Sequence, residues 1–162
     1  MRILLVISTT RYSKESVRKA IEEARSASGR HEPVHLHVLY IIEQAELEAV
    51  RRSVGEAGFL GTETQSQVVD ELARQHHRIA RRRIGTARRL SRNIDGLELS
   101  VQEEEADFVS RTTEVARDGE FDVVFLTRAD RPFISRFLFG SQADRVARLV
   151  RSGQTEVRIE EV

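Results

Sequence analysis

The chain has 162 residues, no cysteine, and 26 basic against 26 acidic side chains, so its formal net charge at neutral pH is zero. This length suits one domain that buries its own core, and the balanced charge provides no overall field to attract nucleic acid or an acidic membrane surface. The lack of cysteine excludes disulfides, thiolate metal sites and cysteine nucleophiles. No apolar run has the length of a membrane span or a signal-peptide core, so we expect a soluble, cytoplasmic protein with no membrane partner.

The first half of the chain predicts two buried strands with a helix between them. Residues 2–8 (RILLVIS) and 34–42 (VHLHVLYII) are continuous apolar runs, typical of strands that are covered on both faces in a parallel sheet. Between them, apolar residues recur at helical spacing after Ser13, which is a suitable N-cap. The connection after the second strand has helical spacing over residues 43–54, and a connection of this length often forms a lid or a contact surface.

The second half predicts a long helix and then three strands that alternate with two shorter helices. The long helix covers residues 63–94 and is expected to direct its apolar side chains, Leu90 among them, towards the core. Asp107 and Ser141 are suitable N-caps for the two shorter helices. The expected strands cover residues 97–103, 121–127 and 155–162. This alternation predicts an α/β fold with an open five-stranded parallel sheet and helices on both faces. The expected strand order is 3-2-1-4-5.

A ligand site is expected at one edge of this sheet. In doubly wound sheets, ligands bind beyond the carboxyl ends of the strands, where the strand order reverses. If the first strand lies beside the fourth, Ser8, Thr9 and Thr10 face residues 127–141 across one crevice. The sequence therefore directs the search for a ligand to these two loops.

The start of the last helix offers donors to an anion in this crevice. Unpaired main-chain amides follow Gly140, and a helix N-terminus favours negative charge, so an anion beside Ser141 and Gln142 is chemically sensible. In the alternative interpretation, Ser141 only caps its helix and Gly140 only makes the turn. Spacing alone favours this second interpretation.

Five stretches carry a resemblance that covers nearly the whole chain. They are RILLVIS, YSKESVRKAIEEA, VHLHVLYI, ADFVSRTTEVARDGEFDVVFLTR and FGSQADRVARLV. In this succession the chain resembles a single universal stress protein domain over residues 1–162. The resemblance implies the Rossmann-like fold of the adenine nucleotide alpha hydrolase type, and a binding or regulatory role in the stress response. It also implies a homodimer formed through the edge strand at residues 155–162.

Members of this family that bind ATP carry a glycine motif after the fourth strand. It consists of a glycine, two residues, a second glycine, nine residues, and then Gly-Ser or Gly-Thr. Gly140 and Ser141 match its end, but Thr127 and Asp130 stand where the two glycines belong, and Ser8 stands where binding members carry an aspartate. Side chains in the loop hinder main-chain amides from approaching the phosphates of a nucleotide, and the Asp130 carboxylate repels those phosphates. We therefore expect no cofactor and no ATP binding through the usual loop.

The alternative is a nucleotide-binding switch or weak ATPase that uses ATP with magnesium. Its candidate contacts are Thr127, Arg128, Gly140 and Ser141 for the phosphates, and Leu39 and Tyr40, near the end of the second strand, for the base. The arginines that surround the loop and offer forked donors to an anion are Arg128, Arg131, Arg136 and Arg145. The sequence contains no defensible serine-histidine-acid or paired-carboxylate arrangement, so we do not expect an enzyme.

One concentrated basic feature stands out, the run of residues 74–92 (RQHHRIARRRIGTARRLSR) with its eight arginines. A helix with such a stripe can lie along a phosphate backbone. However, the run lacks aromatic residues for stacking on bases, and Glu98 and residues 103–105 are placed to neutralise it within the fold. A solvated helix face is therefore the favoured interpretation, and nucleic acid is not an expected partner.

The sequence contains two closely spaced pairs of histidines, of which the first has the spacing of metal ligands. His35 and His37 project from the same face of the second strand, which is the geometry of a two-ligand site. No third ligand is apparent near them, so no metal is expected. His76 and His77 are adjacent on the long helix and diverge, as expected of surface or boundary residues.

Overall fold

The computed structural model describes residues 1–29, 33–56, 62–128, 141–150 and 155–161. These residues form a five-stranded parallel sheet with strand order β3-β2-β1-β4-β5. The strands are β1 (Arg2–Ser8), β2 (Val34–Glu43), β3 (Leu97–Ala106), β4 (Val123–Thr127) and β5 (Glu156–Glu160). The helices are α1 (Lys14–Ser28), α2 (Gln44–Glu56), α3 (Thr62–Ser91), α4 (Phe108–Asp118) and α6 (Gln142–Val150). The predicted fold class and strand order are confirmed.

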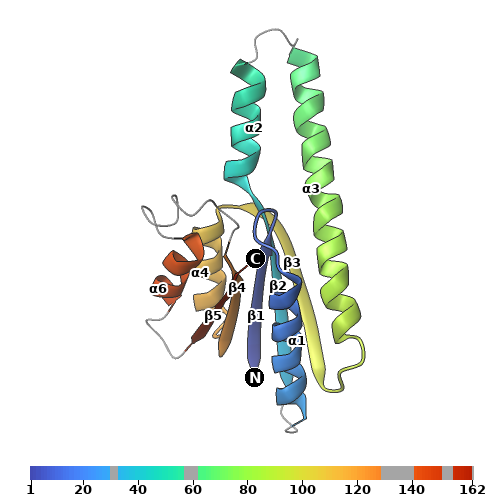
Figure 1. The fold of residues 1–162 in the computed structure, drawn as a ribbon, viewed down its shortest axis with the longest axis vertical. Coiled ribbons are helices and arrows are strands. Elements are labelled where there is room, and N and C mark those ends of the chain that lie inside the picture. The colour runs from blue at the N-terminus through green and yellow to red at the C-terminus, as the bar shows by residue number, and fades with distance from the viewer. Residues whose placement is uncertain (30–32, 57–61, 129–140, 151–154, 162) are drawn as a thin grey trace.

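Helices cover both faces of the sheet (Figure 1). α1 and α3 pack on one face, and α4 and α6 pack on the other. In the central strand β1, Ile3, Leu5 and Ile7 belong to the core under α1 and α3, whereas Leu4 and Val6 belong to the core under α4 and α6. All five side chains are fully buried. The run is continuously apolar because a strand covered on both faces needs an apolar side chain at every position.

Two of the predicted helix starts are confirmed by their caps. The Ser13 hydroxyl accepts a hydrogen bond from the main-chain amide of Glu15 at 3.2 Å, and the Asp107 carboxylate accepts one from the amide of Ser110 at 2.8 Å. Each cap satisfies an amide that has no partner within its own helix. The pKa of Asp107 lies below its ordinary value because the Ser110 amide stabilises the ionised carboxylate.

α2 and the first half of α3 form a helical hairpin that projects beyond the carboxyl edge of the sheet (Figure 1). Leu47 is buried at its base, whereas Val50 and Val54 are only partly covered. His76 is also buried at the base, with its Nε2 3.8 Å from Glu46 Oε1, although a surface or boundary position was expected for it. None of the described helices is long and apolar enough to cross a membrane.

Some predicted boundaries and one predicted core residue were wrong. β3 does not end at residue 103 but continues to Ala106, because it pairs residue by residue with β2, which runs to Glu43. β4 and β5 are shorter than expected, and α3 ends at Ser91. Leu90 is 43% exposed, since the helix turns it away from the sheet. The buried residues on the second half of α3 are His76, Ala80, Ile84, Ala87 and Ser91.

Candidate ligand crevice

The strand order reverses at β1, which pairs with β2 on one side and with β4 on the other. From β1 the chain passes through α1 on one face of the sheet to β2, and from β4 it passes through α6 on the other face to β5, so a crevice is expected between the carboxyl ends of β1 and β4. Four segments contribute side chains here: the loop after β1, the end of β2, the start of α4 and the start of α6. Their side chains meet around a single arginine.

Arg11 occupies the crevice. Its side chain is only 2% exposed, although it lies in the loop that follows β1. The guanidinium donates to the carboxylate of Glu43 at the end of β2 and, through Nη2, to Oε1 of Gln142 in the first turn of α6 at 2.7 Å. Its Cζ also lies 4.3 Å from the ring centroid of Phe108, in cation–π contact. Arg11 therefore fills the space between these segments and links them.

Glu43 is the acidic centre of this cluster. The hydroxyls of Ser8 and Thr10 each donate to its Oε1 at 2.5 Å, and its own amide donates to Thr9 Oγ1 at 3.3 Å. Burial acts to raise the pKa of this carboxyl, but the charge and hydrogen bonds of Arg11, together with the two hydroxyl donors, outweigh burial and hold the pKa below its ordinary value. Glu43 is therefore ionised at neutral pH and balances the charge of Arg11.

Arg83 of α3 braces the same loop. Its Nη1 donates to the main-chain carbonyl oxygens of Ser8 at 2.5 Å and Thr9 at 2.9 Å, and to the Tyr40 hydroxyl at 3.4 Å. Its guanidinium also covers the ring of Tyr12, with 4.6 Å between Cζ and the ring centroid. The loop after β1 is thus fixed at its main chain by Arg83 and at its side chains by the cluster around Arg11.

The N-terminus of α6 is closed by residues of its own first turn. Ser141 Oγ accepts from the Asp144 amide at 3.1 Å, and the Asp144 carboxylate accepts from the Ser141 amide at 3.2 Å and the Ser141 hydroxyl at 2.6 Å. Arg128 donates to Asp144 at 2.7 Å and to Glu161 at 2.6 Å. Ser141 therefore acts as an N-cap, and the Asp144 carboxylate provides the negative charge that a helix N-terminus favours.

The structure brings several of the predicted site residues together. Ser8, Thr9 and Thr10 surround the Glu43 carboxylate, and Gln142 reaches the same cluster through Arg11. The first loop therefore lies beside the start of α6 in one crevice. These side chains are bonded to one another and to the charged pair at the centre.

Other predicted site residues lie elsewhere. Thr127 is buried, and its hydroxyl lies 2.7 Å from the hydroxyl of Ser16 in α1. Leu39 and Tyr40 are inside β2 and fully buried, because the strand runs on to Glu43, so the last residue of β2 at the crevice is Glu43 instead. Arg145 is exposed on α6. Outside the described residues lie Asp130, Arg131, Arg136 and Gly140.

Sequence reasoning missed Arg11, Glu43 and Phe108. A signal for the first two was present, because an arginine follows the first buried strand closely and a glutamate directly ends the second. The carboxyl ends of neighbouring parallel strands meet at the same edge of the sheet, so opposite charges at both ends predict an ion pair there. The role of Phe108 depends on how α4 packs, which the local sequence does not specify.

The histidines of β2 pair with the neighbouring strand. His35 Nδ1 lies 2.9 Å from a Glu98 carboxylate oxygen, and His37 Nδ1 lies 2.7 Å from the Ser100 hydroxyl. Both partners sit directly opposite in the register of β3. In the part of the chain that the structure describes, no three His, Cys, Asp or Glu side chains are grouped to hold a metal ion.

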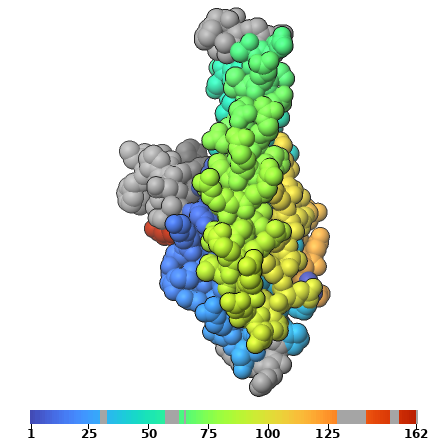
Figure 2. Space-filling model, turned by 90° about the vertical axis from the view of Figure 1, so that its right-hand side faces the viewer, coloured from blue at the N-terminus to red at the C-terminus, as the bar shows by residue number. Residues whose placement is uncertain are grey.

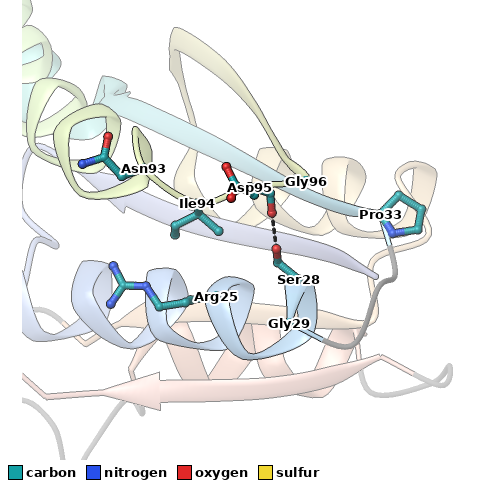
Figure 3. A pocket seen from close by; sticks show the side chains of 8 residues that line it. All are labelled: Arg25, Ser28, Gly29, Pro33, Asn93, Ile94, Asp95 and Gly96. Atoms are coloured by element: carbon teal, nitrogen blue, oxygen red, sulfur yellow. Dashed lines mark hydrogen bonds between the residues drawn. The ribbon is translucent and has the colours of Figure 1, made fainter.

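A cavity of about 610 Å³ lies at the opposite end of the sheet (Figure 3). It is bounded by the end of α1 and by the turn before β3, where the Ser28 hydroxyl donates to the main-chain carbonyl of Asp95. Arg25 and Asn93 point towards it from the two sides. This cavity is separate from the crevice, because it adjoins the amino ends of the strands rather than their carboxyl ends.

Comparison with known proteins identified one family and several solved structures of similar fold. The model of the "Universal stress protein family" matches residues 1–152. The hypothetical protein MJ0577 aligns over 99% of this chain and 95% of its own at 11% identity and a TM-score of 0.64. The universal stress protein UspA from Lactobacillus plantarum aligns over 98% and 96% at 15% identity and a TM-score of 0.62. A universal stress protein family member from Burkholderia pseudomallei aligns over 98% and 94% at 17% identity and a TM-score of 0.50. At these identities the structural likeness shows the fold alone. The comparison with curated proteins found no match.

Proposed function

Because the chain belongs to the universal stress protein family, we propose that it is a binding or regulatory protein of the stress response that works without ATP in its crevice. Arg11 is the observation that carries this proposal. A buried guanidinium occupies the switch point of the sheet, where the fold places a ligand, and it is held there by Glu43, Gln142 and Phe108.

The residues of the crevice do not fit the phosphates of ATP. At the start of α6, the Asp144 carboxylate already accepts the amide and hydroxyl of Ser141, so a phosphate there would meet a like charge. A ligand that displaced Arg11 would leave the Glu43 carboxylate buried without its counter-charge. The polar side chains of the described crevice form hydrogen bonds with one another, which leaves them unsuited to catalysis. We therefore propose that the protein binds its partner through another surface.

We expect calorimetric titration of the nucleotide-stripped protein with ATP and magnesium to detect no binding up to about 1 mM nucleotide, a concentration that corresponds to only about 4 kcal/mol of binding free energy. The matched variant is Arg11→Ser/Glu43→Ser, which removes the pair without leaving an unpaired buried charge. Nucleotide binding gained in this variant identifies the pair as the obstacle. Micromolar binding by the wild-type protein contradicts the proposal.

The proposal includes a homodimer formed through β5, the edge strand beside β4. The Glu156 amide donates to the Asp122 carbonyl at 2.9 Å, and the Glu160 carbonyl accepts from the Arg128 amide at 2.8 Å. Main-chain groups alternate in direction along a strand, so those of Ile159 point away from β4, towards the free edge. No described strand covers this side of β5, and a second copy of the chain offers the same unpaired groups in return.

Ile159→Pro is expected to convert the dimer to a monomer. The proline removes an amide that points to the free edge and leaves the hydrogen bonds of Glu156 and Glu160 to the β4 side in place. Size-exclusion chromatography with light scattering, at micromolar protein concentration, measures the mass of each form. Ile159→Ala is the control, because it shortens the side chain and keeps the amide. If Ile159→Pro stays dimeric under these conditions, the dimer does not use this edge.

A further inference from the structure

The outer face of α3 and the turn that directly follows it carry five exposed arginines that have no acidic partner among the described residues. They are Arg81, Arg82, Arg88, Arg89 and Arg92. By contrast, Arg74 and Arg78, earlier in the helix, both pair with Glu71. Figure 2 shows α3 running down one face of the molecule beside α1, in front of the sheet. These five arginines and Lys14 of α1 are referred to below as the α3 basic face.

Three of the four acidic residues that were expected to neutralise this helix pair with side chains other than its arginines, and the fourth, Glu105, is exposed and forms no ion pair with the described arginines. The ion pairs join Glu98 to His35, Glu103 to His77, and Glu104 to Arg111. Only one of these partners, His77, belongs to α3, and it precedes all five of the arginines that have no acidic partner. The expected neutralisation by β3 was therefore wrong for the arginines, and their charge remains available to a ligand.

A groove between the start of α1 and α3 extends the positive surface. It has a volume of about 520 Å³, its lining includes Lys14, Arg82 and Arg89, and no carboxylate lines it among the described residues. The nearest acidic residue along α1, Glu15, forms an ion pair with Arg18, whose Nε donates to the carboxylate at 3.0 Å. With Arg83, which also lines the groove, four cations therefore surround a concave site that has no carboxylate among the described residues.

The dimensions of the face match a chain of phosphates better than a single anion. From Arg81 to the end of α3 at Ser91 the helix rises about 15 Å, at about 1.5 Å per residue. Phosphates in a strand that is stacked as in a duplex follow one another at roughly 3.4 Å along the axis, so about four phosphates of a stacked single strand span this length. Because the chain has no net charge, the attraction must come from this local array.

We propose that the α3 basic face binds the phosphate backbone of a single-stranded nucleic acid without reading its sequence. The arginines supply forked donors to phosphate oxygens, and the groove at Lys14 receives the backbone where it crosses from α3 to α1. Contacts to phosphates position a protein but carry no sequence information, and the arginine run has no aromatic side chain for stacking on bases. This function is separate from the crevice and does not depend on whether ATP binds there.

Fluorescence anisotropy with a labelled single-stranded RNA of mixed sequence tests the proposal. We expect binding at 50 mM salt that weakens roughly 20- to 50-fold by 200 mM salt, as the release of counterions from three to four phosphates requires. Arg82→Glu/Arg88→Glu/Arg89→Glu should weaken binding by at least about 10-fold at low salt. Arg82→Lys/Arg88→Lys/Arg89→Lys, which keeps the charge, should stay within about threefold of the wild type.

The matched control is Arg51→Glu/Arg52→Glu/Arg148→Glu, which reverses three exposed arginines on α2 and α6 and makes the same change in net charge. This control should retain most of the affinity, and circular dichroism melting checks that both reversed variants are folded. The proposal is overturned if the wild type does not bind RNA at 50 mM salt, or if the two reversed variants lose affinity equally. Binding to phosphatidylserine vesicles without binding to RNA overturns it as well.

Discussion

Arg11→Ala is expected to lower the free energy of unfolding by about 3–5 kcal/mol, because it leaves the buried Glu43 carboxylate without its counter-charge. The variant also loses the donor to Gln142 and the contact with Phe108. Urea titration at neutral pH measures this loss. A loss below about 1 kcal/mol would mean that the pair is solvated like a surface ion pair.

The pH dependence of this loss distinguishes an uncompensated charge from a simple packing defect. In the wild type the pKa of Glu43 is lowered, so its stabilising contribution is complete above the ordinary value of 4.5 and is lost as the pH falls through the folded-state pKa. In Arg11→Ala, burial still acts to raise the pKa of this carboxyl, and only the hydroxyls of Ser8 and Thr10 still act to lower it, so its pKa should lie above that in the wild type. As the pH falls, the carboxyl of the variant becomes protonated first, and that of the wild type follows below its lowered folded-state pKa, so the difference in stability should shrink. A packing defect would leave the difference constant.

The double variant Arg11→Leu/Glu43→Leu is the control for this experiment. It replaces both charges by apolar side chains and leaves no buried charge without a partner, so it should be more stable than Arg11→Ala. The hydroxyls of Ser8 and Thr10 lose their acceptor in this variant, so it should regain only part of the free energy of unfolding that Arg11→Ala loses. If the double variant is no more stable than Arg11→Ala, the cost of the single change does not come from the unpaired carboxylate.

Arg83→Ala has the second large expected effect, a loss of about 2–4 kcal/mol of unfolding free energy. The change removes two charged hydrogen bonds to the main-chain carbonyls of Ser8 and Thr9 and uncovers the ring of Tyr12. The loop after β1 should loosen as well, so the amides of Thr9 and Thr10 should exchange faster with deuterium. Urea titration and hydrogen exchange measure the two effects.

Two further variants separate this role from the charge of α3. Arg82→Ala changes the exposed neighbour of Arg83 and should alter stability by less than about 0.5 kcal/mol. Arg83→Lys keeps the charge but lacks the planar guanidinium that covers the ring of Tyr12 while its Nη1 donates to both carbonyls, so it should recover only part of the loss. Full recovery by lysine would show that charge, not geometry, fixes the loop.

The fold was largely predictable because its signals are local. β1 is apolar at every position since both of its faces are covered, and Ser13 and Asp107 cap their helices through amides only two or three residues away. Each of these patterns is set by a few adjacent residues and by the geometry of one element. Strand order follows from this alternation together with the resemblance to the family.

The candidate site was predictable only in part because its contacts join distant segments. The strand pattern places Ser8 and Thr10 at the carboxyl end of β1, where they lie, but Arg11 meets Glu43 and Gln142 across separations that no local pattern encodes. The charges in the sequence alone also did not predict which side chains pair with the arginines of α3. The acidic residues of β3 follow its arginines in the sequence, yet they bond to other partners, since register and helix rotation decide which side chains meet.

Substitutions in the projecting hairpin of α2 and α3 should be tolerated better during evolution than substitutions in the sheet and its two cores. Leu47 and His76 are buried at its base, whereas side chains farther along, such as Val50 and Val54, contribute little to the two cores that hold the sheet. Substitutions there weaken local helix contacts and leave the sheet intact, because stability is not shared evenly across a structure. Natural selection can therefore change the surface of the hairpin between lineages while the sheet and its buried charge pair stay the same.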